Sequence, residues 1–192
     1  MKVGLYFGSF NPIHHGHLII ANHIYNYTDC EEVWLIVSPQ NPLKKPGTLL
    51  NDYQRLHLAN LAVLDDPYLK VKDIEFRLPK PSFTIDSMAY IQEKYPEHQF
   101  YIIVGADSWL NISKWKNNTQ LIDNHIFIIY PRTGFPIDIP PNSKHMYVQA
   151  PLIEISASSI RSMIREKKSI RYLLPENVRE EIEMAGYYKK SI

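Results

Sequence analysis

The chain has 192 residues, of which 45% are hydrophobic and 21% are charged, and its 21 Lys and Arg residues against 20 Asp and Glu residues give a formal net charge of +1. This balance excludes a chain-wide cationic surface, so we expect no nucleic-acid partner, and the single cysteine, Cys30, excludes an internal disulfide and a multi-cysteine zinc site. Because no run approaches the roughly 18 apolar residues of a membrane span, we expect a cytoplasmic protein with no membrane partner.

Short apolar runs alternate with segments of helical periodicity. Runs rich in Val, Ile, Tyr and Phe predict strands buried on both faces at Lys2–Phe7, Val33–Ser38, Val71–Phe76, Gln99–Val104, His125–Tyr130 and Met146–Gln149. Apolar spacing predicts helices at His15–Tyr27, Asn51–Leu64, Thr84–Tyr95, Ser156–Arg171 and Pro175–Ala185, and the Pro- and Gly-containing segment Arg132–Lys144 predicts a loop. This alternation predicts an α/β fold, a Rossmann-like, doubly wound, mostly parallel sheet with helices on both faces, in a single domain over residues 1–192.

The strongest functional signal follows the first predicted strand, where residues 8–17 read GSFNPIHHGH. Glycine lets the backbone turn tightly and approach a ligand closely, and a helix beginning near His15 presents N–H groups and the positive end of its dipole. His14 and His17 are three residues apart, so a helical first turn places both imidazoles on one side. The pattern favours a phosphate site. Alternatives are a His-x-x-His zinc site, histidines that only cap the helix, and an ordinary strand–helix turn.

Two further basic or hydroxyl-rich segments could contact an anion. Residues 155–161 read ISASSIR, so serines enter a predicted helix whose stretch from Arg161 to Arg171 holds five basic residues and one acid. Residues 42–46 read PLKKP in the loop after the second predicted strand. A solvated helix face and a surface turn, respectively, are the competing interpretations.

Three segments in the middle of the chain are candidates for contacts to a nucleoside. Asp107, in Gly-Ala-Asp after the fourth predicted strand, could accept hydrogen bonds from a ribose or cap a helix. Trp115 lies between two lysines, where it could stack on a ring or pack into the core. Residues 82–86 read SFTID at a helix start, and Arg132 follows the fifth predicted strand as a candidate phosphate contact or a solvated arginine.

Together these motifs, in this order, resemble the bacterial nicotinate-mononucleotide adenylyltransferase family, within the His-x-Gly-His nucleotidyltransferase superfamily. The resemblance covers nearly the whole chain. It implies adenylyl transfer from ATP to nicotinate mononucleotide, giving nicotinate adenine dinucleotide and pyrophosphate, in NAD biosynthesis. It implies catalytic roles for His14, His17 and Arg161.

By position, the resemblance implies two sets of binding residues. ATP would contact Gly8, Ser9, Phe10, His14, His17, Lys44, Gly105, Asp107, Ser158, Ser159 and Arg161. The mononucleotide would contact Thr84, Asp86, Trp115 and Arg132. The family often has Pro-His-Lys where this chain has Pro-Leu-Lys, so either Lys44 or Lys45 could be the phosphate-binding lysine.

Two other functions stay open on the sequence alone. Pantetheine-phosphate adenylyltransferases share the overall order of motifs but typically have Thr-x-Gly-His and lack the Gly-Ala-Asp…Trp block. A non-catalytic module that senses ATP would not need paired histidines.

No general base is needed, because the attacking phosphate monoester is ionised at neutral pH. No carboxylate cage for a metal is visible, so we expect Mg²⁺ to be held by the phosphates and water. The sequence gives no oligomeric state, and a homo-oligomer stays open.

Overall fold

The computed structural model describes residues 1–39, 49–139 and 143–189. Within them, six strands form one parallel sheet in the order β3-β2-β1-β4-β5-β6. The strands are β1 (Lys2–Gly8), β2 (Glu32–Val37), β3 (Leu69–Lys72), β4 (Gln99–Gly105), β5 (Ile126–Tyr130) and β6 (Met146–Tyr147). The predicted parallel α/β sheet is therefore confirmed.

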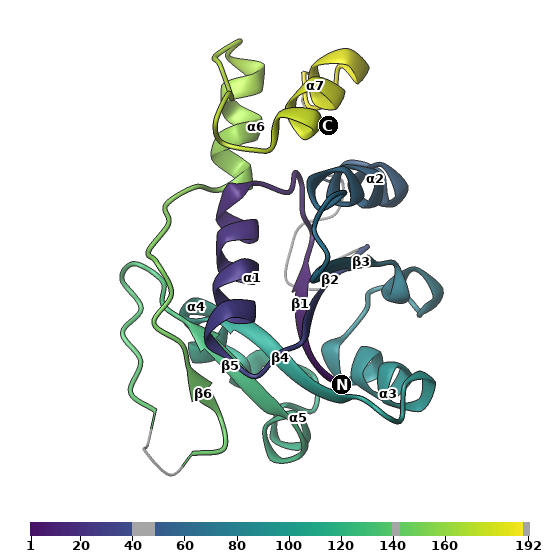
Figure 1. The fold of residues 1–192 in the computed structure, drawn as a ribbon, viewed down its shortest axis with the longest axis vertical. Coiled ribbons are helices and arrows are strands. Elements are labelled where there is room, and N and C mark those ends of the chain that lie inside the picture. Colours follow the sequence, from purple (N-terminus) through teal and green to yellow (C-terminus); the bar gives the residue numbers. More distant parts are fainter. Residues whose placement is uncertain (40–48, 140–142, 190–192) are drawn as a thin grey trace.

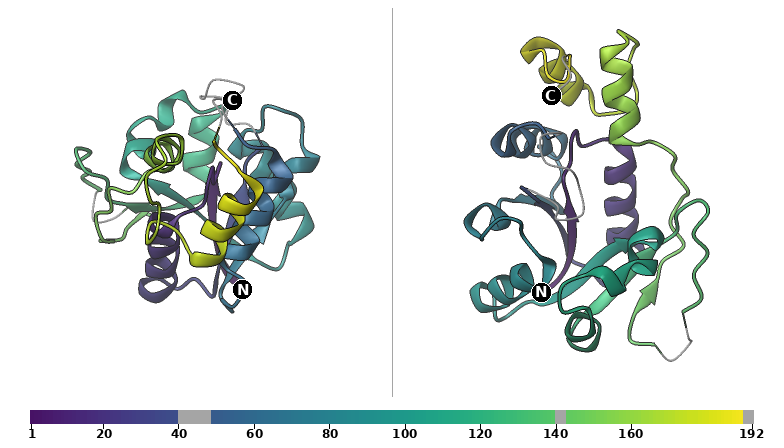
Figure 2. Two further views of the ribbon diagram at one scale, coloured as in Figure 1. Left: turned by 90° about the horizontal axis from the view of Figure 1, so that it is seen from above. Right: turned by 180° about the vertical axis from the view of Figure 1, so that it is seen from behind.

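Helices cover both faces of this sheet (Figures 1 and 2). The helices are α1 (His15–Tyr27), α2 (Asp52–Ala62), α3 (Thr84–Lys94), α4 (Ala106–Leu110), α5 (Asn118–Asn124), α6 (Ala157–Arg165) and α7 (Glu176–Ala185), with 3₁₀ turns η1 (Ile74–Arg77) and η2 (Ile112–Lys114). Alternate strand residues belong to two apolar clusters, one shared with α1, α2, α6 and α7 and the other with α3, α4 and α5. No helix in the described residues combines the length and apolarity needed to cross a bilayer.

The order in which the chain adds strands to the sheet reverses at β1. From β1 the chain goes to β2 and β3 on one side, and β4 then pairs with the opposite edge of β1. The carboxyl ends of β1 and β4 therefore lie next to each other while the connections that follow them diverge. An open parallel sheet presents its ligand crevice at such a position.

Two predicted elements end several residues earlier than expected. The expected strand Val71–Phe76 stops at Lys72, and the next residues form η1, which turns Glu75 toward Ser82 and Ser87. The expected helix Ser156–Arg171 stops at Arg165, because Lys167 adopts φ 55° and the N–H of Lys168 donates to the carbonyl of Met163 at 2.8 Å. This C-terminal motif usually has glycine in the left-handed position, so a lysine there gave no stop signal.

The short elements α4, η2 and α5 were not predicted. They have 5, 3 and 7 residues, too few for a helical period to stand out. The expected start of the last helix is shifted by one residue, since Pro175 is its N-cap, whereas Gly186 ends it at φ 69° as expected. In the described part of Arg132–Lys144 no helix forms and one isolated bridge is present, as expected for a loop.

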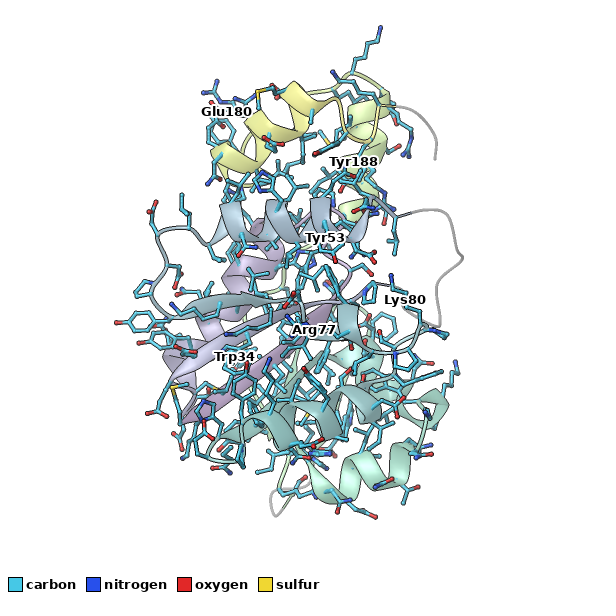
Figure 3. All side chains as sticks on the ribbon, turned by 90° about the vertical axis from the view of Figure 1, so that its right-hand side faces the viewer. Trp34, Tyr53, Arg77, Lys80, Glu180 and Tyr188 are labelled. Carbon is cyan, nitrogen blue, oxygen red and sulfur yellow. The ribbon has the colours of Figure 1, made fainter. Side chains whose placement is uncertain are left out.

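A fully buried arginine fastens the loops at the carboxyl edge of the sheet. The Arg55 guanidinium on α2 donates to the carbonyl oxygens of Ser9, Ser38, Pro39 and Leu50 and to the carboxylate of Asp52. These contacts use all five N–H donors of the side chain. Asp52 also accepts a hydrogen bond from Lys80 at 2.6 Å, and Figure 3 shows Lys80 on the loop that leads to α3. The loops after β1 and β2 and the start of α2 are thus held by one side chain.

Arg55→Met should therefore destabilise the protein strongly. Its loss leaves buried carbonyl oxygens without donors, and breaking such a buried charged network costs about 3–5 kcal/mol. The free energy of unfolding, measured by urea denaturation, tests this. Arg77→Met is the matched control, because Arg77 is exposed and its side chain makes no hydrogen bond or ion pair with the described residues, and its effect should be within about 0.5 kcal/mol. Equal stability of the two variants would contradict this role for Arg55.

Candidate active site

A cavity of about 620 Å³ opens where β1 and β4 end. Five of the residues predicted from the sequence line it: Gly8, Thr84, Gly105, Asp107 and Trp115. They come from four separate parts of the chain, and the parallel sheet brings them together at its carboxyl edge. Ser9, Phe10, His14, His17, Asp86, Arg132, Ser158, Ser159 and Arg161 do not line this cavity.

In the loop after β1, the residue in the left-handed conformation is a buried phenylalanine and not a glycine. Phe10 adopts φ 43° and its side chain is 2% exposed, with its ring 5.0 Å from that of His17. A Cβ at Gly8 would lie 2.8 Å from the Phe10 ring, so the glycine is required for close packing. The Phe10 side chain is thus part of the support beneath the loop, and only its backbone can contribute to a ligand contact.

His14 and His17 lie together at the start of α1. Their rings stack with centroids 3.7 Å apart, and the His14 backbone N–H donates to Nδ1 of His17 at 3.3 Å. An accepting Nδ1 leaves the proton of a neutral His17 ring on Nε2, which makes that atom a donor. Gly16 lets the rings approach, because a Cβ there would lie 2.9 Å from Nδ1 of His14. The His-x-Gly-His spacing therefore builds one imidazole pair.

The environment of His14 favours its neutral form. Its ring is buried, and Nδ1 has no hydrogen-bond partner among the described residues. Burial, followed by the positive charges of Arg132 and His15, lowers the pKa of His14 to about 4. A bound anion would act in the opposite sense, because a neighbouring negative charge favours the protonated ring. The His14 ring is thus neutral near pH 7 in this structure.

The His17 ring contacts Tyr6, which forms part of the cavity wall. The two ring centroids lie 6.2 Å apart, and Tyr6 lines the cavity. The Tyr6 hydroxyl lies 3.0 Å from that of Tyr130, another lining residue, and burial raises the pKa of Tyr6. The imidazole pair and the cavity are consequently neighbours that share one aromatic wall.

The start of α6 packs against the β1–α1 loop. Arg161 donates from Nη1 to the carbonyl of Asn11 at 2.7 Å, across 150 residues of sequence. Ser156 caps the helix by accepting the N–H of Ser159 at 3.1 Å, and Ser158 and Ser159 are exposed. Figure 1 shows α6 beyond the carboxyl end of β1. The second basic segment is therefore attached to the loop that carries the histidines.

One expected backbone donor is already occupied. The N–H of His15, at the start of α1, donates to the carbonyl of Leu173 at 3.0 Å. The N–H of His14 donates to Nδ1 of His17, and the N–H of His17 donates to the carbonyl of His14 at 2.9 Å, so an anion at this helix end would rely mainly on the imidazoles.

Asp107 and Arg132 form an ion pair at the cavity. The Arg132 Nε lies 3.5 Å from Oδ1 of Asp107, and both side chains are partly exposed. Asp107 lies in the first turn of α4, whose N-cap is Gly105, so the alternative interpretation as an N-cap is wrong. A Cβ at Gly105 would lie 2.5 Å from Oδ1 of Asp107, which explains the glycine before this carboxylate.

Thr84 and Trp115 face the same cavity from different elements. Thr84 is the first residue of α3, and the half-buried Trp115 ends η2. Glu75, 2% exposed, accepts hydrogen bonds from the hydroxyls of Ser82 at 2.9 Å and Ser87 at 2.6 Å. This buried carboxylate fixes the segment that carries Thr84.

The structure places a lysine beside the Ser82–Asp86 segment. Lys116 donates to both carboxylate oxygens of Asp86, at 2.8 and 3.1 Å, and its Nζ lies 4.8 Å from the centre of the Phe83 ring. The segment itself contains no basic residue, so sequence reasoning missed this cation. It also missed Arg55 and Glu75. Each acts through contacts with loops distant in sequence, and no local motif indicates such contacts.

Two further predictions concern the lysine loop and metals. Lys44 and Lys45 lie outside the described residues. Across the described ranges, no three His, Cys, Asp or Glu side chains group closely enough to hold a metal ion.

Known proteins resemble this chain over its full length. Residues 5–163 match the family model described as cytidylyltransferase-like. A probable nicotinate-nucleotide adenylyltransferase of Flavobacterium psychrophilum is 49% identical, covering 99% of this chain and 100% of the relative. One from Cytophaga hutchinsonii is 46% identical, covering 98% of each chain. In structure, nicotinic acid mononucleotide adenylyltransferase of Plasmodium falciparum, complexed with NaAD, matches with a TM-score of 0.83 at 22% identity, covering 97% of each chain. This last match shows the fold.

The low pKa of His14 predicts a pH-dependent stability. Its folded value of about 4 lies below the ordinary value of 6.5, so the unfolded chain binds more protons between these values. Stability from this group is complete above about pH 6.5 and is lost as the pH falls toward 4, by about 3 kcal/mol in all. Urea unfolding at a series of pH values should show that His14→Asn loses less stability than the parent over this window. His57→Asn, at an exposed position, should keep the parental pH dependence. Parallel pH curves for the parent and His14→Asn would be the contrary result.

Proposed function

From the premise that this chain belongs to the cytidylyltransferase-like family, and within it to the nicotinate-nucleotide adenylyltransferases, we propose residue roles for its reaction. The enzyme transfers the adenylyl group of ATP to nicotinate mononucleotide, which gives nicotinate adenine dinucleotide and pyrophosphate in NAD biosynthesis. The observation that carries the assignment of roles is the cavity at the carboxyl ends of β1 and β4, with the imidazole pair beside it.

The chemistry requires positioning and charge stabilisation more than proton transfer. An oxygen of the mononucleotide phosphate attacks the α-phosphorus of ATP, and the bond from that phosphorus to the oxygen bridging to the β-phosphate breaks. The electron pair leaves with pyrophosphate. The nucleophile is already ionised at neutral pH, so we assign no general base. Catalysis then comes from orienting the two phosphates and from donors aimed at the developing charge.

The phosphate half of the site is assigned to the β1–α1 loop and the start of α6. His14 and His17 donate to the phosphates of ATP as neutral rings. Backbone groups of residues 8–10 also contact ATP. The Nε2–H of His17 is suited to this role because its Nδ1 accepts the His14 N–H. Arg161, with the Ser158 and Ser159 hydroxyls, binds the outer phosphates. The contact of Arg161 with the Asn11 carbonyl supports this placement because it joins the two segments. Lys44 or Lys45 completes the proposed set.

The nucleoside half of the site is assigned to the elements that follow β3 and β4. Gly105 and Asp107 contact the adenosine side, and Arg132 contacts the phosphate of the mononucleotide. Thr84 and the backbone around it donate to the nicotinate carboxylate, with Trp115 stacked on the positively charged pyridinium ring. Four of these residues line the cavity; Arg132 adjoins it through its ion pair with Asp107. Asp86 acts at the same end, where it holds Lys116.

Mg²⁺ is proposed to enter as part of the ATP complex. In the described residues the two carboxylates that line the cavity have partners, Asp107 with Arg132 and Glu75 with Ser82 and Ser87, and no set of three ligating side chains is present. These residues do not fit a protein-held metal, so the ion would be held by phosphate oxygens and water. No step above depends on it.

We further propose that residues 1–192 act as one domain in the cytoplasm, where the reaction finds its ATP. The proposed contacts run from Gly8 to Arg161, so the site needs both ends of this span.

A substrate panel tests the function. With ATP and Mg²⁺, pyrophosphate release should be seen with nicotinate mononucleotide and, at lower kcat/KM, with nicotinamide mononucleotide. Phosphopantetheine should give none. A carboxylate only accepts hydrogen bonds, whereas the amide NH₂ would face donors, so we expect a preference for the acid of about 10-fold or more. Turnover of phosphopantetheine alone would transfer the assignment to pantetheine-phosphate adenylylation. ATP binding without turnover of any acceptor would favour a sensor.

His17→Ala tests the catalytic role of the imidazole pair. Loss of one transition-state donor costs about 3 kcal/mol, which corresponds to a kcat about a hundredfold lower. Steady-state kinetics measure this, and circular dichroism checks the fold. His57→Ala is the control, because His57 is an exposed residue of α2 that does not line the cavity, and kcat should stay near the parental value. A His17→Ala enzyme with parental kcat would exclude the proposed role.

A further inference from the structure

Lys116 brings a positive charge to the end of the cavity where Thr84 and Trp115 lie. It follows Trp115 directly and lines the cavity with Phe83 and Thr84. Two contacts hold its ammonium there: hydrogen bonds of 2.8 and 3.1 Å to the Asp86 carboxylate, and the face of the Phe83 ring at 4.8 Å. The two partners lie at the start of α3, so the lysine joins the η2–α5 connection to that helix start.

The ammonium keeps capacity for a further partner. A lysine has three N–H donors, and Asp86 is the only hydrogen-bonding partner that the described part of the chain supplies to Lys116. Its side chain is 44% exposed, so its charge is partly desolvated but open to a ligand. A ligand carboxylate in the cavity would gain a charge-assisted hydrogen bond, which is stronger than the neutral bond that a carboxamide oxygen would form.

We propose that Lys116 is a specificity-determining residue, whose ammonium, held at the cavity by Asp86 and Phe83, selects the mononucleotide with a carboxylate over the one with a carboxamide. This inference rests on the proposed function, because that function places the pyridine ring between Thr84 and Trp115. It adds a charge-based component to the neutral donors assigned there.

Asp86 sets the strength of this selection. Its carboxylate fixes the ammonium but also cancels part of its field, so removing the two charges should change the acid preference in opposite directions. The other charged groups lining the cavity have their own partners: Glu75 with Ser82 and Ser87, Lys114 with Asn111 at 2.6 Å, and Asp107 with Arg132. They stay the same in each variant, so the ratio of the two substrates isolates Lys116 and Asp86.

The test is the ratio of kcat/KM for nicotinate mononucleotide to that for nicotinamide mononucleotide, at saturating ATP and Mg²⁺. Partial loss of folded enzyme cancels in this ratio. Lys116→Met should lower it by about 3- to 10-fold, as expected for one partly exposed charged contact, and Asp86→Asn should raise it about 3-fold. Lys116→Arg should retain most of the parental ratio. Lys168→Met is the matched control, because Lys168 also pairs with a carboxylate, that of Glu166 at 2.7 Å, but does not line the cavity, and the ratio should not change.

Salt provides a second readout, in which partial loss of folded variant again cancels. Between about 0.1 and about 1 M NaCl the Debye length falls from about 10 to about 3 Å, so the acid preference of the parent enzyme should decline and that of Lys116→Met should not. If the parent enzyme is active, an unchanged ratio in Lys116→Met together with an unchanged parental ratio at high salt would overturn the role of Lys116 alone. Parental enzyme that uses neither mononucleotide would overturn the proposed function together with this inference.

Discussion

The geometry of the carboxyl edge depends on one buried cation. Arg55 has no exposed surface, and its five N–H donors go to four backbone carbonyls and one carboxylate. Removing a guanidinium from water is costly unless each donor is satisfied, and here the loops themselves provide the acceptors. The hydrogen bonds that stabilise the buried cation are therefore the same bonds that fix the loops after β1 and β2. Because Asp52 continues the network to Lys80, the constraint also reaches the loop that leads to α3 (Figure 3).

The sequence predicted the parts of this molecule that depend on local patterns. The bounds of α1 and the parallel sheet follow from periodicity, and the place of Gly8, Gly105 and Asp107 at one edge follows from the ends of the strands. The place of Thr84 and Trp115 beside them was implied by the family resemblance. The errors arise where a local signal is missing. Lys167 takes a left-handed conformation that usually belongs to glycine, and Phe10 does the same in the β1–α1 loop, so neither turn could be located from composition.

The contacts that the sequence did not predict are those between distant segments. Arg55 donates to Ser9, 46 residues earlier, Arg161 donates to Asn11, 150 residues earlier, and Lys116 contacts Asp86 across 30 residues. Arg161 belongs to a predicted motif, but nothing in the sequence marks the partner of any of the three residues. A motif shows which backbone can bind a ligand, whereas the side chains that hold that backbone in place emerge only from the packed structure.

The two ends of the cavity place charge in ways that suit different tasks. Beside the cavity, the His14 ring of the stacked imidazole pair is neutral near pH 7, since burial keeps its pKa near 4. In the proposed reaction, a donor at this position strengthens its hydrogen bond as charge develops on the leaving oxygens, next to the cationic Arg161 proposed for the outer phosphates. In the proposed site, Lys116 lies by the pyridine ring, which takes no part in bond making. Its proposed interaction would be equal in the ground and transition states, so it would contribute to the choice of substrate through KM and leave kcat to the imidazole pair.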